Sequence, residues 1–564
     1  MAAWRSGHSR SEGYGGSARA EKVRPSRQSI RNGGLHLTLT GATVGGLGDW
    51  QSQRRFPRVR PMTGLSPEHV DVLIVGAGIS GIGGAVHLQD RCPGTTFVIL
   101  EGRPDIGGTW DLFRYPGVRS DSDMHTLGFR FKPWKHEKSI ADGPAILDYL
   151  RETIAENDLA RHIRSGHRVT TAEWSSGDAR WTVTATRTDP DSGSEQPVTM
   201  TCGFLYMCSG YYSYREGYTP EFAGRERFGG RIIHPQEWPE DLDYVDKKVV
   251  VIGSGATAMT LVPAIAHDVA HITMLQRSPT YVVSRPARDV FANRLRRLLP
   301  EKVAYAIIRR KNIFRQGLVY RKTRTDPEKI KNLLIGGVRA GLGPDYDVDT
   351  HFTPTYNPWD QRLCLIPDGD LFKVIRSGRA SVVTDIVDTF TETGIRLQSG
   401  EDLEADIIVT ATGLNLVTLG EMDFVVDGEP VDFARTWTYR GLAYSGVPNL
   451  GSSFGYVNAS WTLKADLTSE YVCRLLKHMA KVGATRCVPL LRPSDSDMPQ
   501  RPWIDDFPAG YMKRSMHLLP RQGDRAPWLN TQDYARDVKL IRRSALDDGV
   551  MAFDAPDREF AGAG

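Results

Sequence analysis

The sequence predicts an α/β protein with two Rossmann-like, three-layer domains. Two glycine-rich loops, at residues 76–81 and 253–258, each follow a short apolar segment of strand character. At 564 residues the chain is too long for one hydrophobic core and should divide into two or three domains. Two loops of this kind indicate two bound dinucleotides.

The first loop lies in a strand–loop–helix pattern. Residues 70–75 are an apolar run typical of a buried strand, and residues 82–89 continue as a helix. In such a motif Gly76 permits the tight turn, Gly78 lets the backbone approach a pyrophosphate, and Gly81 allows close helix–strand packing. The N-terminus of the helix then presents free N–H groups to the phosphates.

A second predicted strand, at residues 96–100, ends at Glu101. A carboxylate at this place can accept hydrogen bonds from both hydroxyls of an adenosine ribose. A glycine turn that binds nothing is the alternative. The strand, the helix and Glu101 in register favour a nucleotide site.

The second loop repeats the pattern with two changes. It follows an apolar strand at 248–252, and Ala258 stands where the third glycine would be, which the packing role tolerates. The next strand, at 272–275, leads to Arg277 and Ser278 instead of an acid. A guanidinium and a hydroxyl accommodate a 2′-phosphate, which a carboxylate would repel, so we predict a preference for NADP. A solvated arginine at a strand end is the alternative.

Between the loops, residues 228–239 carry the pattern Phe-x-Gly-x-x-x-His-x-x-x-Trp-Pro. This pattern resembles the fingerprint of the flavin-dependent Baeyer–Villiger monooxygenases. We interpret His234 as part of a linker that sets how two domains rotate against each other; proton transfer is the alternative. The resemblance runs from about residue 70 to residue 551 and is closest to a subgroup that also oxidises thioamide or thioether sulfur.

The resemblance implies a set of site residues. Those of the FAD site are Gly76, Gly78, Ser80, Gly81, Glu101, Gly108, Thr109, Trp110, Asp111, Leu112, Arg119, Asp121 and Val169. Those of the NADPH site are Gly253, Ser254, Gly255, Ala256, Thr257, Ala258, Arg277 and Ser278.

The same resemblance places the active-site arginine at Arg362. Its segment, residues 356–364, matches the part of the family that carries the essential arginine, although Gln361 stands where a lysine is common. The chemistry needs a permanent cation, and guanidinium stays charged at any working pH. Asp121 would orient Arg362 as the second catalytic residue; a purely structural ion pair is the alternative.

The implied reaction uses NADPH and O₂ to convert a ketone into an ester or lactone through a flavin C4a-peroxide, and extends to organosulfur substrates. Two other interpretations stay open. One is a sulfur- or nitrogen-oxidising flavin monooxygenase with little ketone activity. The other is a non-catalytic flavin- and NADP-binding redox sensor. The substrate is expected to be a small ketone or organosulfur molecule and the chain a monomer or weak oligomer.

The predicted organisation has the NADP domain inserted into the FAD domain. Residues 62–210 form the first part of the FAD domain, residues 211–390 the NADP domain with a helical insertion at 287–345, and residues 391–564 the second part of the FAD domain. Residues 1–61 hold 11 Lys/Arg against 3 Asp/Glu and read as a disordered basic tail, or as sequence before a true start at Met62.

Composition and charge limit the remaining functions. The six cysteines show no metal-ligand or redox spacing, which argues against a disulfide reductase and fits a reducing, cytoplasmic setting. Residues 287–340 hold 15 Lys/Arg against 4 Asp/Glu. This segment is either a solvated insertion or a peripheral contact with anionic lipid. No nucleic-acid module accompanies it, so nucleic-acid binding is not expected.

Overall fold

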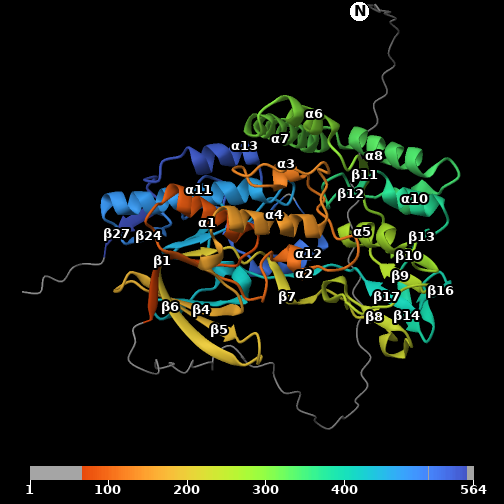
Figure 1. Cartoon of the computed structure of the whole chain (residues 1–564), viewed down its shortest axis with the longest axis horizontal. Helices are drawn as coiled ribbons and strands as arrows, with labels where there is room; N and C mark the ends of the chain where they lie inside the picture. Colours follow the sequence, from red (N-terminus) through yellow and green to blue (C-terminus); the bar gives the residue numbers. More distant parts are fainter. Residues whose placement is uncertain (1–66, 506, 508, 556–564) are drawn as a thin grey trace, which may run out of the picture. The chain divides into compact units, whose positions relative to one another are not determined.

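The computed structural model of the chain describes residues 67–505, 507 and 509–555. The expectations for residues 1–61 lie outside this range. The described part contains one mixed and one parallel sheet, each with helices packed on it (Figure 1). The prediction of an α/β protein with two Rossmann-like units is confirmed.

The first sheet has the strand order β20–β19–β4–β5–β6–β1–β2–β3, with β23 also paired to β6. The strands are β1 (Glu68–Val75), β2 (Phe97–Leu100), β3 (Ile163–Arg164), β4 (His167–Ser175), β5 (Arg180–Thr188), β6 (Glu195–Met207), β19 (Asp423–Val426), β20 (Glu429–Pro430) and β23 (Leu450–Ser452). Strand β1 lies parallel to both β2 and β6. Its residues Val72, Leu73 and Ile74 are fully buried, as expected of a parallel strand covered on both faces.

Three helices, α1 (Ile79–Arg91), α4 (Gly143–Glu156) and α11 (Thr462–Val482), pack their apolar sides on one face of this sheet. On the opposite face, side chains of β1 and β2 pack with those of the antiparallel strands β4, β5 and β6. The third layer of this domain is therefore built from strands.

The second sheet is parallel throughout, in the order β13–β10–β9–β17–β8. Its strands are β8 (Arg231–Ile233), β9 (Lys248–Ile252), β10 (His271–Gln276), β13 (Ala380–Thr384) and β17 (Ile407–Thr410). Helices α5 (Ala256–Ile265), α8 (Pro327–Leu342) and α10 (Asp370–Arg376) contribute to the core on one face. The small sheet of β14 (Val387–Thr391), β15 (Gly394–Leu397) and β16 (Asp402–Glu404) contributes to the core on the other.

The end of the second domain differs from the sequence-based boundary at residue 390. Strand β17 lies between β8 and β9 in the second sheet, and β14 to β16 pack on that sheet too. The apolar run of β17 predicts a buried strand, but a short run does not reveal which of the two sheets will include it. The second domain therefore continues to Thr410, and the chain returns to the first sheet at β19.

Two segments connect the domains and pair with each other. Strand β7 (Tyr212–Gly217) leads into the second domain, and β18 (Leu414–Leu416) leads back. They form an antiparallel ribbon. The second domain is thus inserted into the first, as predicted.

The helical insertion consists of α6 (Val290–Leu298), α7 (Glu301–Thr325) and α8. Two separate helical patterns in the sequence, at 303–308 and 313–319, belong to the single helix α7. Arg309 of α7 fastens the insertion to the first domain by donating to Gly128 O at 2.7 Å and to Asp466 Oδ2 at 3.4 Å. Among the described helices, none has the length and apolar character required to cross a membrane.

Further short elements complete the fold. They are α2 (Thr109–Leu112), α3 (Met124–Leu127), α9 (Val348–Phe352), α12 (Gly510–Ser515), α13 (Tyr534–Asp537), β11 (Val282–Arg285), β12 (Cys364–Pro367), β21 (Thr438–Tyr439), β22 (Ala443–Tyr444), β24 (Arg486–Pro489), β25 (Arg501–Pro502), β26 (Arg521–Gln522) and β27 (Met551–Asp554).

Candidate functional site

Both glycine loops open onto one cavity of about 1320 Å³ between the two sheets. Its lining includes most of the residues that the sequence singled out: Gly76, Gly78, Ser80, Glu101, Gly108, Thr109, Trp110, Arg119, Asp121, Val169, Gly253, Ser254, Gly255, Ala256, Thr257, Arg277, Ser278 and Arg362. The cavity thus brings together groups from segments hundreds of residues apart.

Four of the predicted cofactor residues lie behind this lining: Gly81, Asp111, Leu112 and Ala258. Gly81 has a packing role, since a Cβ there would lie 1.9 Å from Gly76 O. Ala258 is fully buried in α5. The Asp111 carboxylate accepts from Arg103 Nε at 3.0 Å and from Arg114 Nη2 at 3.2 Å, and so links α2 to the segments on either side of it.

Each loop turns tightly against the end of a neighbouring strand. Gly76 has φ +104°, and a Cβ on it would approach Cys208 O to 2.7 Å. Gly253 has φ +138°, and its Cβ would approach Ala411 O to 2.3 Å. Only glycine satisfies both the positive φ and the lack of space, which accounts for these positions in the two motifs.

Glu101 stands at the end of β2, where the sequence predicted a ribose-binding carboxylate. Its Oε2 accepts from Ala77 N at 2.7 Å, and its Oε1 accepts from Arg103 N at 3.0 Å. Burial raises the pKa of Glu101, and these two backbone donors oppose that effect. Each oxygen keeps a further lone pair for a hydroxyl in the cavity.

Arg277 and Ser278 follow β10 and are exposed at the second loop. Ser278 is held in place because its carbonyl accepts from Ser254 Oγ at 3.1 Å. Arg277 therefore lines the cavity together with the second glycine loop, a place that suits recognition of a 2′-phosphate.

Arg362 and Asp121 form a bidentate ion pair in the cavity. Arg362 Nε donates to Asp121 Oδ2 at 2.7 Å, and Nη2 donates to Oδ1 at 2.8 Å. The charge of Asp121 raises the pKa of Arg362 well above its ordinary value, so the guanidinium keeps its charge at any pH. The Arg362 side chain is 38% exposed because it faces the cavity.

The loop that carries Arg362 is anchored by the helical insertion. Arg324 of α7 donates to Asp360 Oδ1 at 2.7 Å and to Trp359 O at 2.9 Å. Trp359 has φ +71°, a strained conformation for a large side chain. The insertion therefore fixes the backbone immediately before Arg362.

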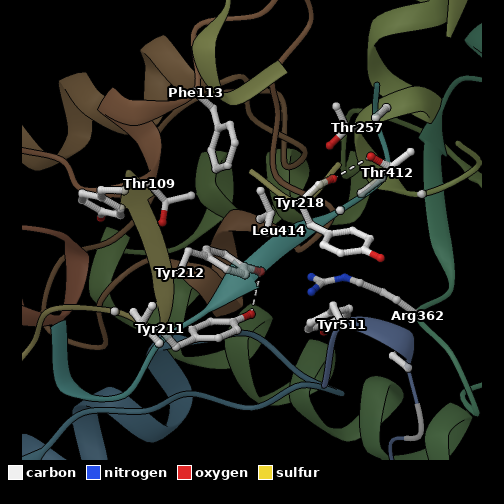
Figure 2. A pocket seen from close by; sticks show the side chains of 18 of the residues that line it. Thr109, Phe113, Tyr211, Tyr212, Tyr218, Thr257, Arg362, Thr412, Leu414 and Tyr511 are labelled. Carbon is white, nitrogen blue, oxygen red and sulfur yellow. Dashed lines mark hydrogen bonds between the residues drawn. The ribbon is translucent and has the colours of Figure 1, made fainter. Parts of the chain in front are cut away.

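Three tyrosines around Arg362 were not recognised in the sequence. Figure 2 shows the Tyr211 and Tyr212 rings on one side of the guanidinium and Tyr511 below it. The Tyr211 and Tyr212 hydroxyls share a hydrogen bond of 2.7 Å. Burial raises the pKa of all three hydroxyls, so they stay protonated and able to donate.

Sequence signals for these tyrosines differ in strength. Tyr211 and Tyr212 follow the carboxyl end of β6, where ligands bind in parallel sheets, and this position could have marked them. Tyr511 comes from α12, which has no motif. A fourth aromatic residue, Trp461, stacks on Tyr211 with 5.2 Å between the ring centroids. Its Nε1 donates to Ser80 Oγ at 2.8 Å.

His234 lies at the crossing of the two connecting segments. Its Nε2 donates to Gly413 O at 3.0 Å, because its Nδ1 accepts from Gln236 N at 3.2 Å. A Cβ on Gly217 would lie 1.8 Å from His234 Cε1, so the ring rests against the backbone of β7. Both nitrogens are engaged with backbone, which supports the linker interpretation over a catalytic base.

This geometry predicts a pH-dependent stabilisation by His234. Burial lowers the pKa of His234 in the folded protein, so the unfolded chain takes up the proton first. The stabilisation of the folded protein by neutral His234 is therefore present above pH about 6.5 and is lost as the pH falls below that value. We expect His234→Gln to reduce stability by about 1–3 kcal/mol at pH 8. The difference in thermal midpoint between wild type and variant should narrow at pH 5.5. A variant with normal stability and no oxygenation would instead support proton transfer.

The fold and the site define a class: a two-domain dinucleotide-binding protein with a fixed cation in the cavity that both nucleotide loops share. A family profile described as "Flavin-binding monooxygenase-like" matches residues 133–315, and one described as "NAD(P)-binding Rossmann-like domain" matches residues 74–140. The chain is 54% identical to the FAD-containing monooxygenase EthA of Mycobacterium tuberculosis, over 86% of this chain and 98% of that protein. It is 53% identical to EthA of Mycolicibacterium smegmatis, over 86% of this chain and 97% of that protein. The chain belongs to the FAD-containing monooxygenase family.

Solved structures show the same fold. An oxidised steroid monooxygenase bound to NADP superposes with a TM-score of 0.67 at 24% identity, covering 86% of this chain and 100% of that one. Cyclohexanone monooxygenase from Rhodococcus sp. Phi1 bound to NADP⁺ superposes with a TM-score of 0.61 at 21% identity, covering 76% of this chain and 87% of that one.

Proposed function

We propose that the protein is an NADPH- and O₂-dependent Baeyer–Villiger monooxygenase that converts ketones into esters or lactones. We propose further that it transfers oxygen to the sulfur of thioamides and thioethers. The observation that carries the proposal is the Arg362–Asp121 pair in the cavity that both nucleotide loops share. The family membership and the linker pattern at residues 228–239 support it.

The residues at the first loop fit FAD. The α1 N-terminus after Gly78 offers free N–H groups to a pyrophosphate, and Glu101 has lone pairs for ribose hydroxyls. The residues at the second loop fit NADPH. A Cβ on Gly255 would meet no protein atom within 4 Å, so the backbone there faces open space in which a pyrophosphate can lie. When bound and reduced by NADPH, FAD supplies the activation of O₂.

The side chains around Arg362 have three roles in this proposal. The guanidinium stabilises negative charge that develops on oxygen, and Asp121 holds it in one orientation. The protonated hydroxyls of Tyr212 and Tyr511 offer hydrogen bonds to a polar group of the substrate. The rings of Tyr211 and Trp461 form an apolar wall that limits access of water.

Product analysis tests this function. The purified protein would be supplied with NADPH and ¹⁸O₂, and with a cyclic ketone or an aryl methyl thioether. We expect a lactone or a sulfoxide that contains one ¹⁸O atom, formed in step with NADPH consumption. NADPH oxidation that yields only hydrogen peroxide would reject the proposal. Sulfoxide without lactone across a panel of ketones would restrict it to sulfur oxidation.

Arg277 should determine the choice between NADPH and NADH. We expect Arg277→Ala to raise the KM for NADPH by about 10- to 100-fold, since a charge-assisted contact with a phosphate is lost. The KM for NADH should stay unchanged, because NADH has no 2′-phosphate. Steady-state kinetics with both nucleotides measure this. Arg379→Ala, an exposed arginine of the same domain outside the cavity, serves as the control. An equal rise in the KM for NADPH and for NADH would contradict the assignment of Arg277 to the 2′-phosphate.

A further inference from the structure

The helical insertion carries an unusual concentration of exposed apolar side chains. Of the fifteen large apolar side chains exposed in the described part of the chain, nine lie on α6, α7 and α8. They are Val290, Phe291, Leu298, Val303, Ile307, Phe314, Leu318, Val319 and Leu333. Exposed apolar residues that gather in one region mark an interaction site, whereas single scattered ones do not. We call these nine residues, with the basic side chains among them, the insertion surface.

On α7 the apolar residues form a stripe. Four of them are Val303, Ile307, Phe314 and Leu318, and at 3.6 residues per turn they fall within about 60° of the helix circumference. The side of α7 that faces the protein is different, since Ala304 and Ile308 are fully buried there. Phe314 is 64% exposed and Leu298, at the end of α6, is 78% exposed. The stripe therefore points away from the core. Helices α6 and α7 lie at the outer edge of the fold (Figure 1).

The same three helices expose many basic side chains. Ten lysines and arginines of the insertion are exposed: Arg294, Arg297, Lys302, Arg310, Arg315, Arg321, Lys322, Arg324, Lys329 and Arg339. Arg310 and Arg321 fall on the same side of α7 as the apolar stripe. Residues 287–340 hold four acidic residues, of which Asp289 is paired with Lys311 at 3.1 Å and Glu301 with Lys135 at 3.4 Å. The insertion surface is therefore both apolar and strongly positive.

We propose that the insertion surface docks the protein on a bilayer surface rich in anionic lipid. The apolar stripe would enter the boundary between headgroups and acyl chains, and the arginines and lysines would contact lipid phosphates. A second copy of the chain that paired through the same surface would bring the same positive charge and repel it. Nucleic acid would satisfy the charge but leave the apolar stripe in water. An anionic bilayer satisfies both features at once.

Vesicle sedimentation with the full, cofactor-loaded chain tests the proposal. Vesicles of phosphatidylglycerol and phosphatidylcholine in equal parts would be compared with pure phosphatidylcholine. We expect binding to the anionic vesicles only, and at least tenfold weaker binding by Phe314→Ser/Leu318→Ser and by Arg310→Glu/Arg321→Glu. The matched control is Leu490→Ser/Leu491→Ser, two exposed leucines outside the insertion. Surface variants that bind as wild type does would overturn the proposal, as would dimerisation through this surface in light scattering.

A local probe is needed because residues 1–61 also carry 11 Lys/Arg, which attract the same vesicles. All six native cysteines are buried, so an introduced cysteine can be labelled selectively. A polarity-sensitive fluorophore on Phe314→Cys should shift to shorter wavelength when anionic vesicles are added, and the same fluorophore on Leu490→Cys should not. Sedimentation without a shift at position 314 would show that another segment binds the lipid. Oxygenation of a water-soluble ketone without vesicles should be unchanged in the surface variants, which separates this proposal from the catalytic one.

Discussion

Arg362→Ala is expected to lower kcat for oxygenation by about 100- to 1000-fold, the usual effect of removing one preorganised charge from an active site. Arg362 lies in the shared cavity and is held by both oxygens of Asp121. Reduction of the flavin by NADPH does not need this charge and should continue. The variant should therefore consume NADPH and release hydrogen peroxide instead of oxygenated product. Stopped-flow reduction and product analysis together measure the two steps.

Two control variants distinguish the loss of the positive charge from the loss of hydrogen-bond geometry and from a general loss of stability. Arg362→Lys keeps a cation but loses the two parallel hydrogen bonds to Asp121, so we expect partial activity, above that of the alanine variant. Arg396 forms a similar bidentate pair with Asp402, at 2.8 and 2.7 Å, on the exposed hairpin of β15 and β16. Arg396→Ala should leave oxygenation unchanged. An Arg362→Ala enzyme that still forms ester at the wild-type rate would refute the assigned role.

Lys464→Ala is expected to destabilise the protein by about 3–5 kcal/mol, because it leaves a buried charge without its partner. Lys464 is completely buried; its Nζ donates to Asn530 Oδ1 at 2.7 Å and lies 3.2 Å from Asp537 Oδ2. Asp537 also accepts from Tyr456 OH at 2.8 Å. Since Tyr456 lines the cavity, loss of this network should weaken cofactor retention too. The denaturation midpoint and the release of flavin fluorescence on heating measure both effects.

A matched double variant tests whether the unpaired charge of Asp537 causes the loss of stability in the Lys464 variants. Lys464→Met/Asp537→Leu removes both charges and keeps an apolar interior, so it should recover much of the stability lost in Lys464→Met alone. The exposed pair Lys248–Glu404 provides the comparison. Lys248→Met should leave the denaturation midpoint nearly unchanged, since water replaces the partner. An equally small effect at Lys464 would contradict the account of a buried ion pair.

The sequence by itself determined the two nucleotide units. Each combines a strand, a glycine turn and a helix within about thirty residues, so local patterns were sufficient for Gly76 and Gly253. Arg362 could be selected because its segment resembles a family motif. Its pairing with Asp121 was expected on the same ground, and the structure brings the two side chains together.

Only the tertiary structure decided which sheet receives β17, which side chains form the walls of the cavity, and which charges lose contact with water. Tyr511 approaches Arg362 through folding of a C-terminal segment without a motif. Lys464 lies near the start of α11, and its charge is paired in the interior with Asp537, 73 residues away. The physical reason is the same in each case. Local propensity and glycine geometry act between neighbours in the chain, whereas burial and charge pairing depend on segments that meet only after folding.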